Sequence, residues 1–101
     1  MDPVEPVTLS LPETLLHEQA AGCRSELTAR LQTLAATASP GAQSWLIDAS
    51  ALREFDSSAL AVLLACRRSA QALGGEVQVR GLPAALRELA SVYGVLELLG
   101  A

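Results

Sequence analysis

The sequence has no lysine, one histidine and two cysteines, and each scarcity excludes a kind of chemistry. All seven basic residues are arginines, so the chain has neither a Schiff-base lysine nor the lysine of a nucleotide-binding P-loop. A single histidine without a Cys-x-x-Cys pair is too small a ligand set for a protein zinc site. We therefore expect no metal and no cofactor, and we expect Cys23 and Cys66 to be free, buried thiols.

Basic clusters and long apolar segments are missing as well. The chain has a formal net charge of −4 and its acidic residues are scattered, which argues against nucleic acid or an anionic membrane surface as the main partner. No apolar run approaches the ~20 residues that a membrane-spanning helix needs. The first six residues are acidic and contain prolines, unlike a signal peptide. We expect a cytoplasmic protein in which residues 1–6 form a flexible tail.

The abundant residues are aliphatic: half of the chain is apolar, whereas Phe, Trp and Tyr occur once each. A chain of 101 residues supports one domain with one aliphatic core, which we expect to span residues 7–101. Strand patterns alternate with helical patterns, with strands at 7–11, 45–47 and 76–80 and helices beginning near 18, 57 and 82. This order predicts an α/β fold with a mixed, partly parallel central sheet and helices mainly on one face.

The connection between the second strand and the second helix contains the most informative residues. The helix begins with Asp56-Ser57-Ser58, and these residue types accept hydrogen bonds from the first amides of a helix. A hydroxyl at the positive end of a helix can also carry a phosphate. Ser57 is therefore either a plain helix cap or a phosphorylation switch.

The second helix has more small apolar residues than its own core requires. An inward stripe is formed by Leu60, Leu63, Cys66 (or Arg67), Ala70 and Leu73. A different face carries Ser57, Ala61, Ala65 and Arg68, with Leu64 at its margin. A solvated helix face usually carries long polar side chains, so this one predicts close approach by another protein. The alternative is that alanine, a good helix former, simply fills exposed positions.

Catalysis by Ser57 would require a neighbouring base. The only histidine, His17, precedes the first helix, where we expect it at a strand end or a helix cap. Asp48 and Asp56 are explained as turn and cap residues rather than as a catalytic pair. Gly74-Gly75 ends a helix instead of beginning one, so no glycine-rich phosphate loop is present. We predict that the chain is not an enzyme.

Asp48-Ala49-Ser50, followed by Phe55-Asp56-Ser57-Ser58, resembles the signature of the STAS family, the domains of sulfate transporters and anti-sigma-factor antagonists. The resemblance extends from about residue 7 to 99 and implies a STAS-like fold. It implies that Ser57 is the hydroxyl that is phosphorylated or contacts a partner, presented by Asp56 and Ser58. The chain departs from the family at Ala59, where a glycine is usual, and looks short by one amino-terminal strand.

Residues 79–82, Leu86 and residues 89–95 resemble the MlaB-type STAS subunits of phospholipid ABC transporters that maintain lipid asymmetry in the bacterial outer membrane (Mla). This resemblance implies a subunit, peripheral to the inner membrane, that docks on the transporter's ATPase subunit through Ser57, Ala61, Ala65 and Arg68, with Tyr93 extending the face. The alternative is an anti-sigma-factor antagonist that binds a kinase-like anti-sigma factor and is switched by phosphorylation of Ser57. The apolar segment 95–99 either folds back on the sheet, which we favour, or forms a homodimer contact.

Overall fold

The computed structural model describes residues 7–37 and 43–100, and its elements follow the predicted alternation of strands and helices. The predicted tail at 1–6 and the predicted helix stop at 38–41 lie outside the described residues. The elements are β1 (Val7–Ser10), β2 (Thr14–Leu15), α1 (His17–Thr37), β3 (Gln43–Asp48), β4 (Glu54–Phe55), α2 (Ser58–Ala72), β5 (Gly75–Arg80), α3 (Ala84–Val92) and the 3₁₀ turn η1 (Glu97–Leu99).

Three of the strands form the central sheet in the order β1-β3-β5, and they run parallel. Leu9, Ile47 and Val79 lie at the same level across this sheet. The short strands β2 and β4 pair separately and are also parallel. The predicted α/β fold class is confirmed, although the antiparallel strand of a mixed sheet is not present in the described part of the chain.

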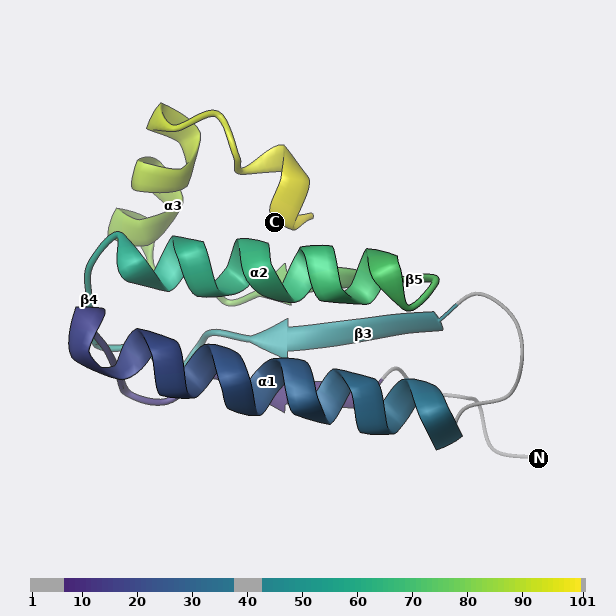
Figure 1. Ribbon diagram of the computed structural model, residues 1–101. Coiled ribbons are helices and arrows are strands. Elements are labelled where there is room, and N and C mark those ends of the chain that lie inside the picture. The colour runs from purple at the N-terminus through teal and green to yellow at the C-terminus, as the bar shows by residue number, and fades with distance from the viewer. Residues whose placement is uncertain (1–6, 38–42, 101) are drawn as a thin grey trace.

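Helices α1 and α2 lie side by side on one face of the central sheet, as predicted (Figure 1). Because side chains alternate across a strand, the sheet has one buried face and one exposed face. In β5, Val77 and Val79 are buried, whereas Glu76, Gln78 and Arg80 are exposed. The largest fully buried side chains are almost all aliphatic, namely Leu9, Leu15, Leu31, Ile47, Leu63, Leu86 and Leu99.

The carboxy-terminal segment folds back, as predicted. Gly94 has a φ of +71°, the left-handed conformation that ends a helix. The Val95 N–H donates to Ala90 O at 2.9 Å and the Gly94 N–H donates to Ser91 O at 3.0 Å, which together form a Schellman motif at the end of α3. Leu99 is then 1% exposed and belongs to the core. No helix within residues 7–37 and 43–100 is both long and apolar enough to cross a bilayer.

Candidate functional site

Strand β3 ends in an Asx turn formed by Asp48, Ala49 and Ser50. The Ser50 N–H donates to Asp48 Oδ1 at 2.9 Å, and the Ala49 N–H donates to Arg80 O at 2.8 Å. Hydrogen bonds from the hydroxyl and the amide of Ser50 favour the charged carboxylate and lower the pKa of Asp48. The geometry agrees with the interpretation of Asp48 as a turn residue.

Gly81, which follows β5, packs against this turn. Its φ is +75°, and a Cβ atom at this position would lie 3.0 Å from Ser50 Cβ and 3.1 Å from Ser50 N. On the inner side, Ala49 is 0% exposed. The central residue of the turn, Ala49, therefore cannot contact a partner, although Ser50 is exposed.

Asp56 forms a second Asx turn, and its carboxylate caps two helices at once. Oδ1 accepts the Ser58 N–H of α2 at 2.8 Å, and Oδ2 accepts the His17 N–H of α1 at 3.1 Å. Figure 1 shows that both helices begin at the same end of the molecule, beside β4. These bonds favour the ionised carboxylate, so the pKa of Asp56 is lowered, chiefly by the Ser58 amide. Asp56 thus joins the starts of α1 and α2.

His17 is the site residue that sequence reasoning missed. It is the first residue of α1, in agreement with the predicted place near a helix cap, but its Nδ1 also lies 3.5 Å from Ser58 Oγ. The pairing of β2 with β4 sets Leu15 beside Phe55, which brings residue 17 to the start of α2. Two-residue strands have no periodicity to detect, so nothing local in the sequence signals this contact.

Ser57 is exposed at the start of α2. It is the N-cap residue by position, with φ −61° and ψ −17°, but its side chain makes no capping hydrogen bond. The capping role falls to Asp56 instead. Of the two roles considered for Ser57, the plain cap does not match this geometry, and its hydroxyl remains accessible to a partner or a modifying enzyme.

Along α2, three of the predicted contact residues are accessible and one is not. Ser57, Ala61 and Arg68 are exposed and Leu64 is half-buried; we call these four residues the α2 face. Ala65 is only 6% exposed, so its assignment to an accessible face is wrong. An α-helix turns about 100° per residue, which places Ala65 about 80° away from Ser57 and nearly in line with Ser58. Ala65 therefore lies on the side of α2 on which Ser58 contacts His17 of α1.

Tyr93 does not belong to the α2 face. It is the C-cap residue of α3 and is 58% exposed, next to Val92 at 79%. The carboxyl end of α3 points away from α2 (Figure 1). Tyr93 is therefore an exposed aromatic residue at a separate place on the surface.

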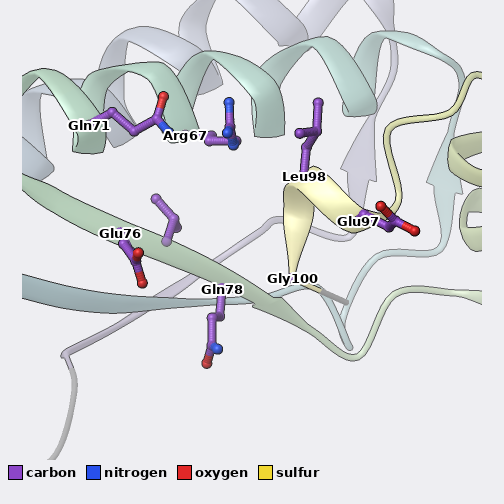
Figure 2. Close-up of a pocket in the computed structure, with 8 residues that line it drawn as sticks. Arg67, Gln71, Glu76, Gln78, Glu97, Leu98 and Gly100 are labelled. Atoms are coloured by element: carbon purple, nitrogen blue, oxygen red, sulfur yellow. The ribbon is translucent and has the colours of Figure 1, made fainter.

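The two cysteines and a hollow on the surface lie at other places in the fold than Ser57. Burial raises the pKa of Cys66 to about 12, and burial also raises the pKa of the half-buried Cys23, so both thiols are poorly reactive. A hollow of about 250 Å³ is lined by residues of α2, β5 and η1 (Figure 2). Its lining carries both signs of charge, because it includes Arg67 as well as Glu76 and Glu97. Within residues 7–37 and 43–100, no three His, Cys, Asp or Glu side chains gather as metal ligands would.

The comparison with known families agrees with this fold. The sequence profile described as "Mlab, STAS domain" matches residues 3–100. The chain belongs to the STAS domain family, whose members typically interact with other proteins. No match was found among the curated proteins.

Proposed function

We propose that this chain is the STAS subunit of an Mla-type phospholipid ABC transporter in a bacterium. It binds the ATPase subunit in the cytoplasm and is held at the inner membrane through that complex. It catalyses no reaction: by binding one conformation of the ATPase more tightly than another, it stabilises the assembled transporter or regulates its activity. The matched family description supports this proposal.

The observation that carries the proposal is the exposed Ser57 hydroxyl, which is not used as a cap. The preceding residue, Asp56, accepts the first amides of both helices through its carboxylate, so the Ser57 hydroxyl lies next to a point where α1 and α2 are joined. The α2 face continues from it with the small Ala61 and the half-buried Leu64, and Arg68 provides a charge further along. Small residues let a partner's backbone approach closely, and Leu64 offers apolar area to bury.

Phosphorylation of Ser57 would regulate this contact. A phosphate adds between one and two negative charges at neutral pH, here next to the ionised Asp56 carboxylate. The repulsion and the cost of desolvating the phosphate would separate the two proteins. In the proposed transporter subunit, Ser57→Asp should therefore weaken binding of the ATPase, and binding as tight as that of the wild type would exclude this form of regulation.

The proposal is tested by affinity purification of the tagged protein from detergent-solubilised native cells, with mass spectrometry as the readout. Ser57→Arg is the disrupting variant. Ala36→Arg is the matched control, because Ala36 is exposed on α1 near the opposite end of the helix pair. We expect the wild type and Ala36→Arg to recover an ABC ATPase with its permease, and Ser57→Arg to lose both.

Other outcomes lead to different conclusions. Recovery of a soluble, kinase-like ATPase in place of the transporter would identify the chain as an anti-sigma-factor antagonist. Recovery of the transporter with Ser57→Arg at the wild-type level would place the interface elsewhere on the domain.

A further inference from the structure

A second hollow involves the side of the central sheet that α1 and α2 do not cover. Its volume is about 510 Å³, and it is lined by residues of β3, β5 and α3 and of the connection between β5 and α3. Leu46 of β3 pairs in register with Gln78 of β5, and both line the hollow. Their side chains lie on the open face of the sheet, because the neighbouring Ile47 and Val79 are buried on the other face. No residue of the α2 face lines this hollow.

The charged side chains that line this hollow are both positive. Arg80 and Arg87 are exposed lining residues, and the lining contains no carboxylate, unlike that of the hollow in Figure 2. Neither guanidinium forms an ion pair with a carboxylate of the described residues. Asp48 pairs with Arg80 in the sheet and offsets part of its charge. On a chain with a net charge of −4, this hollow therefore favours an anionic group.

Beside the arginines, the hollow includes the free edge of β5, which is the last strand in the order β1-β3-β5. Arg80 O accepts the Ala49 N–H at 2.8 Å, so residue 80 directs its backbone groups toward β3. Because backbone groups alternate in direction along a strand, those of Val79 point to the free edge. Val79 lines the hollow although its side chain is only 5% exposed. Unpaired backbone groups at a sheet edge can bind an extended segment of another protein.

We propose that this hollow binds a short, extended acidic segment of a partner protein. Carboxylates of the segment pair with Arg80 and Arg87, and its backbone bonds to Val79 at the edge of β5. An apolar side chain of the segment packs on Leu46 and Leu82, which are half-buried in the same lining. A peptide is favoured over a small anion, because a strand supplies both the carbonyl and the amide with which the backbone of Val79 pairs. This inference does not depend on the proposed function, because it concerns a different surface.

The experiment is an NMR titration of the isotope-labelled chain with a capped pentapeptide in which glutamates flank a central leucine. The matched control peptide has glutamine in place of every glutamate. We expect the glutamate peptide to shift the backbone amide signals of Val79, Gly81 and Arg87. It should bind about tenfold more tightly than the glutamine peptide, because only its side chains are charged.

Substitutions of single arginines locate the contact on the chain. We expect Arg80→Gln and Arg87→Gln each to weaken binding of the glutamate peptide about threefold, and the double variant to weaken it about tenfold. Arg24→Gln is the matched control, since it removes the same charge from an exposed position on α1. It should bind the peptide as tightly as the wild type does. The amide spectrum of each variant without peptide shows directly that its fold is retained.

Three results would overturn the inference. Equal affinity for the two peptides would show that charge does not select the ligand. Equal weakening by Arg24→Gln and by the two variants in the hollow would show attraction to the charge of the whole chain rather than binding at this place. A parallel titration with inorganic phosphate supplies the third: if phosphate shifts the same amides at the same or a lower concentration, the hollow is a site for small anions and the inference fails. None of these results affects recovery of the transporter, which tests the proposed function separately.

Discussion

The connection between β3 and α2 contains two Asx turns, which have the same type of hydrogen bond but different surroundings. In each, an aspartate Oδ1 accepts the amide of the second following residue, Ser50 at 2.9 Å and Ser58 at 2.8 Å. The first turn packs against Gly81, and its central residue, Ala49, is fully buried. The second joins two helices, and its central residue, Ser57, is exposed. The aspartates of the family signature are thus structural, and the environment of the central residue decides whether a turn can bind a partner.

The largest expected effect on stability comes from adding a side-chain atom at Gly81, which packs against the first turn. In Gly81→Ala the new Cβ both forces a residue other than glycine into a positive φ and contacts the Ser50 backbone. We expect a loss of about 2–4 kcal/mol in the free energy of unfolding, measured by urea denaturation. Gly74→Ala is the matched control, since Gly74 has a φ of +83° but nothing within 4 Å. Its free energy of unfolding should fall by only about 1 kcal/mol. Equal losses in Gly74→Ala and Gly81→Ala would show that the first turn shifts to accommodate the added methyl group.

Exchanging the central residues of the two turns tests the comparison directly. Ala49→Ser buries a hydroxyl among apolar neighbours and should cost about 1–3 kcal/mol of unfolding free energy. Ser57→Ala removes a hydroxyl that makes no capping bond and should change stability by less than about 0.5 kcal/mol. Both are measured by urea denaturation. A loss on Ser57→Ala as large as that on Ala49→Ser would mean that Ser57 acts as a cap after all.

Replacement of the two aspartates should cost different amounts of stability, because Asp56 accepts amides from two helices and Asp48 accepts one amide in a turn. Asp56→Ala leaves two helix amides without their acceptor, whereas Asp48→Ala leaves one turn amide without its partner. We expect about twice the loss of stability for Asp56→Ala, since the two caps contribute separately. Hydrogen exchange should also show faster opening at the starts of both α1 and α2. Faster exchange at α2 alone would contradict the idea that one carboxylate serves both helices.

Features that depend on neighbouring residues could be predicted from the sequence, whereas a contact between residues far apart in the sequence could not. The alternation at 76–80 and the three-to-four spacing of the helices are local patterns, and each yielded the correct element. The Asp56-Ser57-Ser58 motif located the start of α2 for the same reason. The contact of His17 with Ser58 depends on the pairing of two-residue strands that have no detectable period. The prediction for Ala65 was wrong because alanine occurs both in cores and on surfaces. Only its angle around α2, about 80° from Ser57, makes it buried while Ser57 is exposed.

The smallest expected effect is a dependence of stability on pH that arises from both turns. The pKa values of Asp48 and Asp56 are lowered in the folded protein, so each carboxylate binds its proton less readily there than in the unfolded chain. Their contribution is therefore present above the ordinary aspartate pKa of about 4 and is lost as the pH falls through the lower, folded values. We expect the urea midpoint to decrease below pH 4 in the wild type and to decrease less steeply in the double variant Asp48→Asn, Asp56→Asn. The decrease in each single variant should lie between those of the wild type and the double variant. If the urea midpoint falls with pH equally steeply in all four proteins, the acid sensitivity comes from carboxylates outside the two turns.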